Sequence, residues 1–140
     1  MAQTIKDVMT SDPACVDPHD TAADAARRMR EVDSGAILVT EDGHLRGVLT
    51  DRDIVVRAIA DGRDPSQVEV AEICSADVQA LHPEDDVDRA VQLMRERHVR
   101  RIPIVDGQDH AVGIVSIGDI ALARQERSAL ADISGAPANA

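Results

Sequence analysis

Two segments of the chain carry apolar residues at helical spacing. Between residues 22 and 29, and again between residues 87 and 94, apolar side chains recur at steps of three, one and three. Such steps line one face of a helix, so the pattern predicts helices that begin near residues 20 and 85. The residues concerned are Ala22, Ala25, Ala26 and Met29 in the first segment and Val87, Ala90, Val91 and Met94 in the second.

Each predicted helix is followed by two short apolar runs with turn-forming residues between them. Residues 36–40 and 45–49 flank one turn, and residues 102–105 and 112–115 flank the other. This arrangement is typical of a β-hairpin. A further helix is predicted to begin after Thr50 and after Ser116. With a short extended segment near residues 15–16 or 80–81, each unit has the predicted order β-α-β-β-α.

The two halves of the chain are copies of one unit. A shift of 65 positions brings Met29-Arg30-Glu31 onto Met94-Arg95-Glu96, and after one inserted residue a shift of 66 brings Gly47-Val48-Leu49-Thr50 onto Gly113-Ile114-Val115-Ser116. Each copy is too short to bury a good core alone, so we expect the copies to pack on each other about a pseudo-two-fold axis. The predicted fold class is α/β (α+β), with two β-α-β-β-α repeats.

The predicted division of the chain follows this repeat. Residues 1–62 form the first repeat, residues 63–70 a linker and residues 71–127 the second repeat. Residues 128–140 are rich in small residues and are predicted to form a flexible tail that frays or docks on a partner subunit.

Composition narrows the possible partners. The formal net charge is −11, and Phe, Trp and Tyr are all absent. An acidic surface repels phosphate backbones and anionic lipid, so neither nucleic acid nor membrane is expected as a partner. The first residues lack the apolar segment of a signal peptide, which predicts a cytoplasmic protein. Cys15 and Cys74 are expected to be thiols, and the distance between them decides whether they can pair.

Candidate catalytic and metal-binding patterns are missing from the sequence. The histidines are not spaced at i+3 or i+4 from one another, so no metal site is expected. There is also no P-loop, no recognisable nucleophile motif and no G-x-G-x-x-G sequence, which favours a binding module over an enzyme. The histidines are His19, His44, His82, His98 and His110.

The most informative motif is Thr/Ser-x-x-Asp, which occurs once in each copy at the predicted start of a helix. Its members are Thr50 with Asp53 and Ser116 with Asp119. One interpretation is a capping box, which contributes about 1 kcal/mol to a helix. The other is a ligand site, because a helix N-terminus attracts phosphate and the carboxylate can accept hydrogen bonds from ribose hydroxyls. Both interpretations are compatible with the spacing.

The doubled Gly-hydrophobic-x-Thr/Ser-x-x-Asp-hydrophobic motif resembles the tandem cystathionine-beta-synthase (CBS) domain pair, or Bateman module. The resemblance covers residues 6–125 and is greatest to small stand-alone proteins of the hypoxic-response or dormancy type. It implies a regulatory protein that binds AMP, ADP or ATP, ahead of S-adenosylmethionine or NAD, in two clefts between the copies. It also implies a homodimer formed through the helices that follow Thr50 and Ser116.

The resemblance assigns residues to both clefts, with Asp on the ribose and Thr or Ser on the phosphate. Arg101 is expected on the phosphate of the first cleft and Ile114 beneath its sugar. The first cleft comprises Ser116, Asp119, Arg101, Ile114, Thr10, Ala14, Cys15 and Gly35. The second comprises Thr50, Asp53, Ser75, Gln79, Arg100 and Arg52.

An arginine distinguishes the two copies. The position of Arg101 is occupied by Ala36 in the first copy. A charge-assisted hydrogen bond from arginine to phosphate contributes about 1.5 to 3 kcal/mol, so the Ser116 cleft is expected to bind a phosphorylated ligand more tightly, with Arg52 compensating in part in the Thr50 cleft. The net negative charge of the chain favours modest affinity in both.

Two functional hypotheses follow from the sequence. In the first, an adenosine ligand ties the copies together and changes the surface that a regulated protein meets. In the second, the Thr/Ser-x-x-Asp motifs only cap helices, and the protein is a ligand-independent interaction or scaffold protein that acts as a homodimer. Exposed apolar residues on the helices after Thr50 and Ser116 are compatible with either hypothesis.

Overall fold

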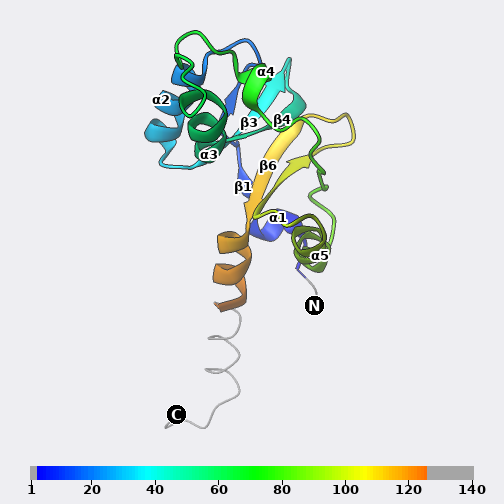
Figure 1. Ribbon diagram of the computed structural model, residues 1–140. Coiled ribbons are helices and arrows are strands. Elements are labelled where there is room, and N and C mark those ends of the chain that lie inside the picture. The colour runs from blue at the N-terminus through cyan, green and yellow to red at the C-terminus, as the bar shows by residue number, and fades with distance from the viewer. Residues whose placement is uncertain (1–2, 126–140) are drawn as a thin grey trace, which may run out of the picture.

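The chain forms two halves, each built on a three-stranded sheet (Figure 1). The computed structural model describes residues 3–125. One sheet has the order β2-β3-β4 and the other has the order β1-β6-β5, with both hairpins antiparallel. The strands are β1 (Thr10–Ser11), β2 (Cys15–Val16), β3 (Ala36–Glu41), β4 (His44–Thr50), β5 (Arg101–Val105) and β6 (Ala111–Ser116).

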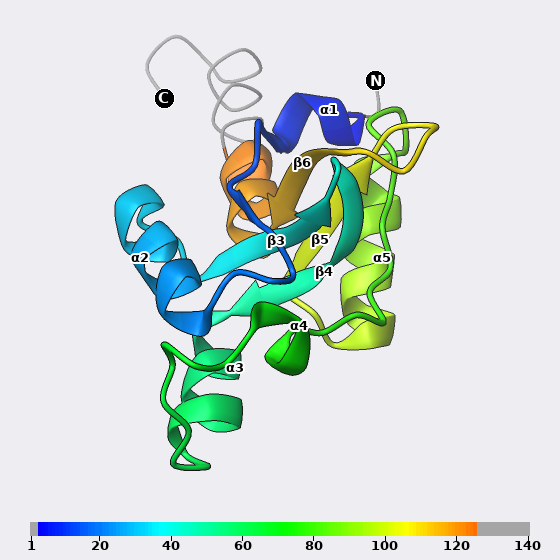
Figure 2. The same ribbon diagram turned by 90° about the horizontal axis from the view of Figure 1, so that it is seen from above.

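Helices cover the outer faces of the two sheets. Figure 2 shows the strands of both hairpins in the middle of the molecule, with α2 on one side and α5 on the other. The labelled helices are α1 (Ile5–Val8), α2 (Ala22–Val32), α3 (Asp51–Ile54), α4 (Val70–Ile73) and α5 (Val87–Arg97). A π-helical segment, Val55–Ile59, continues α3, and a last helix follows β6 over residues 117–125. The predicted α+β class with two repeats is confirmed. Within residues 3–125, no helix is long and apolar enough to span a membrane.

The backbone hydrogen bonds obey the predicted two-fold relation. Val70 N–H donates to the carbonyl of Asp20 at 2.8 Å, and its equivalent Ile5 N–H donates to the carbonyl of Asp85 at 2.9 Å. His44 forms a bridge with His110, its own equivalent in the other copy, and their ring centres lie 4.5 Å apart. A residue meets its own equivalent at a two-fold axis, so the axis passes between the two hairpin turns.

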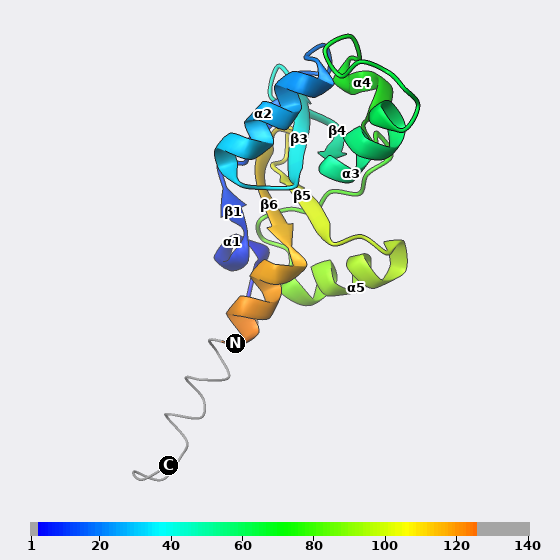
Figure 3. The same cartoon turned by 60° about the vertical axis from the view of Figure 1, so that its left-hand side comes forward.

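The short helix near the start of each repeat packs against the other half of the molecule. α1 belongs to the first repeat in sequence, yet it lies beside α5 at the end of the molecule formed by the second half (Figures 1 and 3). Ile5 of α1 is fully buried in the core of the second half. In the same way, Val70 and Ile73 of α4 are buried in the core of the first half. The predicted boundaries divide the sequence, but α1 and α4 each pack into the core of the other half.

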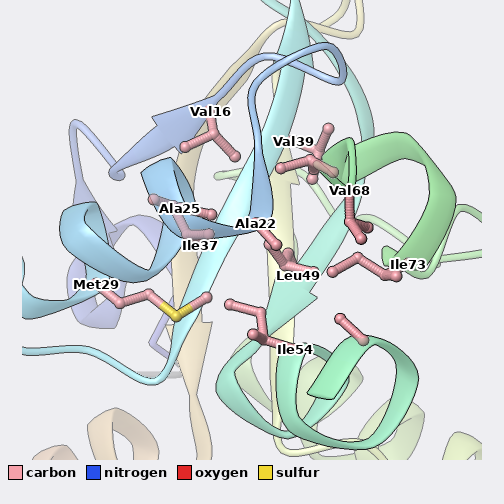
Figure 4. Packing of buried hydrophobic residues seen from close by; sticks show 12 residues of the cluster. Val16, Ala22, Ala25, Met29, Ile37, Val39, Leu49, Ile54, Val68 and Ile73 are labelled. Carbon is pink, nitrogen blue, oxygen red and sulfur yellow. The ribbon is translucent and has the colours of Figure 1, made fainter. Parts of the chain in front are cut away.

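The segment predicted as a linker contributes to the core. Val68 is only 1% exposed and packs with Leu49, Ile54 and Ile73 in the first cluster, as Figure 4 shows. Residues 63–67 lie outside both buried clusters, so only the beginning of this segment acts as a connection. The predicted tail at residues 128–140 lies outside the described residues.

Candidate functional site

The Thr/Ser-x-x-Asp motif forms a capping box at both helix starts. Thr50 N–H donates to Asp53 Oδ2 at 3.0 Å, and Asp53 N–H donates to Thr50 Oγ1 at 3.1 Å. In the second half, Ser116 N–H donates to Asp119 Oδ2 at 2.9 Å, and Asp119 N–H donates to Ser116 Oγ at 3.0 Å. The capping interpretation of the motif is therefore confirmed.

Capping leaves one oxygen of each carboxylate available. In both boxes the capping bonds use Oδ2, and an ionised carboxylate can accept hydrogen bonds at both oxygens. Asp53 Oδ1 lies 3.9 Å from Arg57 Nε, too far for a hydrogen bond. Asp119 Oδ1 receives no hydrogen bond from any residue in the described part of the chain. The capping role is thus compatible with a second role as an acceptor for a ligand.

A cleft of about 470 Å³ opens beside Ser116 and Asp119, and we call it the Ser116 cleft. It lies between the halves because β1 of the first repeat pairs with β6, which places Thr10 opposite Ile114. Every residue predicted for this cleft lines it except Cys15. The lining residues are Thr10, Asp12, Pro13, Ala14, Arg28, Val32, Asp33, Ser34, Gly35, Ala36, Ile37, Arg101, Ile114, Ser116 and Asp119.

Cys15 does not line the cleft for which it was predicted. Its side chain is half-buried in β2, where Sγ donates a hydrogen bond to the carbonyl oxygen of Pro13 at 3.2 Å. Burial raises the pKa of this thiol, while Thr40 and Arg28 act in the opposite direction. The prediction that Cys15 contacts the ligand is not supported by its place in the fold, because its thiol bonds back to its own chain.

The second cleft, which we call the Thr50 cleft, has a volume of about 500 Å³. Ser75 reaches it because its backbone bridges to Val48 of β4, just as Thr10 meets Ile114. All the residues predicted for this cleft line it. The lining residues are Val48, Thr50, Arg52, Asp53, Ser75, Asp77, Val78, Gln79, Leu93, Arg97, His98, Val99, Arg100, Arg101 and Pro103.

Sequence reasoning missed the residues at the carboxyl ends of α2 and α5. Residues 32–34 line the Ser116 cleft, and residues 97–99 occupy the equivalent place in the Thr50 cleft. The repeat contained the signal for them. Gly35 and Arg100 were both predicted and are related by the shift of 65 positions, so the residues just before each were also candidates.

Arg101 lines both clefts. It begins β5 and is paired with Ser116 in the register of the sheet. The same guanidinium is thus available to both clefts, and the expected tighter binding in the Ser116 cleft stays a prediction. Within residues 3–125 there is also no cluster of three His, Cys, Asp or Glu side chains arranged to hold a metal ion.

Comparison with known proteins identifies both repeats. The family model named CBS domain matches residues 5–59 and again residues 70–126. The chain is 43% identical over 135 residues to the CBS domain-containing protein YhcV of Bacillus subtilis, an alignment that covers 94% of this chain and 95% of that protein. It is 36% identical over 119 residues to hypoxic response protein 1 of Mycobacterium tuberculosis, covering 84% of this chain and 82% of that protein.

Solved structures have the same fold. The crystal structure of hypoxic response protein I with two coordinated zinc ions matches with a TM-score of 0.78 at 36% identity, covering 85% of this chain and 97% of that one. The CBS domain pair of protein MJ0100, in complex with 5′-methylthioadenosine and S-adenosyl-L-methionine, matches with a TM-score of 0.82 at 23% identity, covering 91% and 99%. At that identity the second match supports the fold alone.

Proposed function

The chain belongs to the CBS domain family as a tandem pair of repeats, and on that premise we propose that it is a regulatory protein without catalytic activity that binds an adenosine-containing ligand. AMP, ADP and ATP are the proposed ligand class, ahead of S-adenosylmethionine and NAD. One protein of the same fold, the MJ0100 domain pair, holds 5′-methylthioadenosine and S-adenosylmethionine. The fold can thus accommodate adenosyl compounds.

One observation carries this proposal: each cleft joins the capped helix start of one repeat to a segment near the beginning of the other. We call residues 9–14 and 74–79 the lead-in segments. In the Ser116 cleft, Ser116 and Asp119 face Thr10 and Ala14, which come from the opposite end of the chain. The first amides of the two helices, those of Asp51 and Ile117, already donate to the carbonyls of Gly35 and Arg100. The arginine side chains that line each cleft are therefore the groups that suit a phosphate, and the free carboxylate oxygen suits ribose hydroxyls. A ligand bound in this way contacts both repeats at once.

The proposed output is a change in the surface that a regulated protein meets. A ligand that bridges the repeats stabilises one relative arrangement of them over others, since it binds best where both of its walls are in place. The chain brings no catalytic motif of its own, so the occupied and empty forms would be distinguished by a partner protein.

The first experiment uses the absence of Trp and Tyr, which makes the protein almost transparent at 280 nm. A band at 260 nm in the purified protein then reports co-purified nucleotide. The protein stripped of nucleotide is titrated with AMP, ADP, ATP and S-adenosylmethionine, with the melting temperature as readout. A ligand at 100 times its dissociation constant is expected to add about 2.7 kcal/mol to the free energy of unfolding.

Three alanine variants separate binding from capping. Asp53→Ala and Asp119→Ala each remove a capping box that lies in a cleft. Asp24→Ala removes the box that Asp24 forms with Thr21, at 3.1 and 3.2 Å, outside both clefts. All three are expected to lower the free energy of unfolding by about 1 kcal/mol. Only Asp53→Ala and Asp119→Ala should also weaken the response to ligand, and equal responses in all three would contradict the proposal.

A second candidate function rests on the exposed apolar residues of the helices that follow the motifs. In this alternative the protein is a ligand-independent stress or dormancy scaffold that acts as a homodimer. No response to any of the four ligands would favour it over the nucleotide sensor. The residues are Val55, Val56 and Ile59 after β4 and Ile117 and Leu122 after β6, with exposed fractions of 47% to 58%.

A further inference from the structure

The two clefts have opposite charge balances. The Thr50 cleft is lined by four arginines and two aspartates, and the Ser116 cleft by two arginines and three aspartates. The first therefore has an excess of positive charge and the second an excess of negative charge. The Thr50 cleft contains Arg52, Arg97, Arg100, Arg101, Asp53 and Asp77, and the Ser116 cleft contains Arg28, Arg101, Asp12, Asp33 and Asp119.

Much of this difference arises where α2 and α5 end. Val32 and Asp33 in the first repeat correspond to Arg97 and His98 in the second. Asp33 and His98 both adopt the left-handed conformation, with φ of 53° and 54°, so the backbone follows the same path in both repeats. The clefts therefore differ here in the side chains that they carry and not in backbone conformation.

The arginines of the Thr50 cleft are also more available. Within the described part of the chain, no ion pair involves Arg52, Arg100 or Arg101, and Arg97 lies 3.8 Å from an exposed Asp77 carboxylate. In the Ser116 cleft, by contrast, Arg28 Nη1 already lies 3.2 Å from Glu31 Oε2. That leaves Arg101, which lines both clefts, as the one arginine of the Ser116 cleft without an ion pair to a described residue.

We infer, building on the proposed function, that the two clefts select adenosine ligands by charge. The Thr50 cleft takes nucleoside di- and triphosphates, because its unpaired guanidinium groups can each form charge-assisted hydrogen bonds to phosphate oxygens. The Ser116 cleft takes adenosine compounds with at most one phosphate, or with a neutral or cationic 5′ group. Its three carboxylates repel a polyphosphate tail more than its single unpaired arginine attracts it.

The test measures the ligand affinity of one cleft at a time in the whole chain. Asp119→Ala weakens the Ser116 cleft and so reports the Thr50 cleft, whereas Asp53→Ala does the reverse. Each variant is titrated with adenosine, AMP, ADP and ATP by calorimetry at two salt concentrations. In the Thr50 cleft the affinity should rise at least about threefold for each added phosphate, and added salt should reduce that gain. In the Ser116 cleft the affinity should stay level or fall along the same series.

Exchange of one equivalent pair of residues supplies a matched control. Arg97→Val gives the Thr50 cleft the residue of the Ser116 cleft, and it should lower the ATP affinity about threefold or more and the adenosine affinity by less. Val32→Arg makes the opposite change at a side chain that is 38% exposed and can accommodate the longer group. It should raise the affinity of the Ser116 cleft for ATP.

The outcomes separate this inference from the proposed function. The same ligand order in both clefts, or tighter binding of AMP than of ATP in the Thr50 cleft, would overturn the inference while leaving an adenosine-binding protein. Binding of none of the four ligands by the unmodified protein would overturn the proposed function itself. A loss of adenosine affinity in Arg97→Val equal to the loss of ATP affinity would also count against selection by charge.

Discussion

Two equivalent glycines lie where the lead-in segments meet the hairpins. A Cβ atom on Gly47 would lie 2.5 Å from the carbonyl oxygen of Ser75, which is backbone and cannot rotate away. A Cβ on Gly113 would lie 2.6 Å from Sδ of Met9, the flexible side chain of the equivalent segment. These contacts hold the lead-in segments, which line the clefts, against the strands. The two glycines therefore determine how closely each lead-in segment approaches its strand.

Gly47→Ala is expected to lower the free energy of unfolding by about 1 to 3 kcal/mol, the usual cost of forcing extra atoms into a packed site. Gly113→Ala should cost less, since part of its clash can be relieved by movement of the Met9 side chain. Gly107→Ala is the control, because a Cβ there would meet no atom within 4 Å. Urea denaturation measures all three, and equal stabilities of Gly47→Ala and Gly107→Ala would contradict the expectation.

Both cysteine thiols have raised pKa values. Burial is the main cause at Cys15 and at Cys74, and the charge of Asp53 adds to it at Cys74. A raised pKa means that the folded protein holds these protons more firmly than the unfolded chain does. Their contribution to stability is therefore fully present below the unfolded pKa, about 8.5, and is lost as the pH rises through the folded value.

This linkage predicts that the free energy of unfolding falls as the pH rises above about 8.5, the pKa of a thiol in the unfolded chain. The double variant Cys15→Ala, Cys74→Ala should show a shallower decline over this range, measured by denaturation at several pH values. Few other groups interfere, because Lys6 is the only lysine and tyrosine is absent. An identical decline in both proteins would show that the thiols do not contribute.

At the scale of single residues, the repeated motif predicted the helix starts, and the family resemblance supplied most of the other cleft residues. Thr50 and Asp53 were predictable because a repeated spacing marks a helix start. Arg97 and His98 reach a cleft only because α5 ends beside the lead-in segment of its own repeat, a long-range relation that no local pattern records. Cys15 does not line the cleft for which it was predicted, because the direction of a side chain in a two-residue strand depends on what packs around it.

The short helices α1 and α4 connect the lead-in segments to the cores. Ile5 and Val70 occupy equivalent positions, and each is fully buried in the half to which it does not belong in sequence. Neither helix exceeds four residues, and α1 is too short to be stable alone. Each therefore owes its structure to the single apolar face that it inserts into the opposite repeat.

Truncation of these two side chains tests that connection. Ile5→Ala should lower the free energy of unfolding by about 2 to 5 kcal/mol, and Val70→Ala by a smaller amount because fewer carbon atoms are removed. Lys6→Ala, at the exposed neighbour of Ile5, is the control and should change stability by no more than about 0.5 kcal/mol. A harmless Ile5→Ala in thermal or urea unfolding would mean that α1 does not support the second core.

The longer elements were predicted from periodicity, whereas the short ones were not. The predicted helix starts near residues 20 and 85 agree with helices that begin at Ala22 and Val87, since eleven-residue amphipathic segments have a strong pattern. α4 has no such pattern. Residues 61–66 have the composition of a turn, so the segment was predicted as a linker, and only the folded structure reveals that Val68 is buried.

The whole molecule exposes apolar residues on the two helices that follow the motifs. Ile59 is 54% exposed and Leu122 is 58% exposed, on a chain that carries a net charge of −11. Exposed apolar side chains of this size are favoured at interfaces between subunits. We propose that a second copy of the chain covers them, as the resemblance to dimeric CBS pairs implies.

Light scattering tests this assembly. The unmodified protein should have twice the chain mass of 15.0 kDa, whereas Ile59→Asp and Leu122→Asp should shift it toward one chain mass, because a carboxylate is costly to bury in an apolar interface. Val99→Asp is the control, since Val99 is 40% exposed but lines the Thr50 cleft. A single chain mass for the unmodified protein would contradict the proposed homodimer.

The exchange of α1 and α4 between the halves has a consequence for biosynthesis. While the chain emerges from the ribosome, the amino-terminal half must wait for Val68 and Val70 before its core is filled. The segment that contains Ile5 must wait still longer, until β6 has been synthesised. The segment around Ile5 is thus translated early and packed late. Premature termination between β5 and β6 would leave the edge of β5 unpaired and the side chain of Ile5 without its core, both exposed to proteases and chaperones.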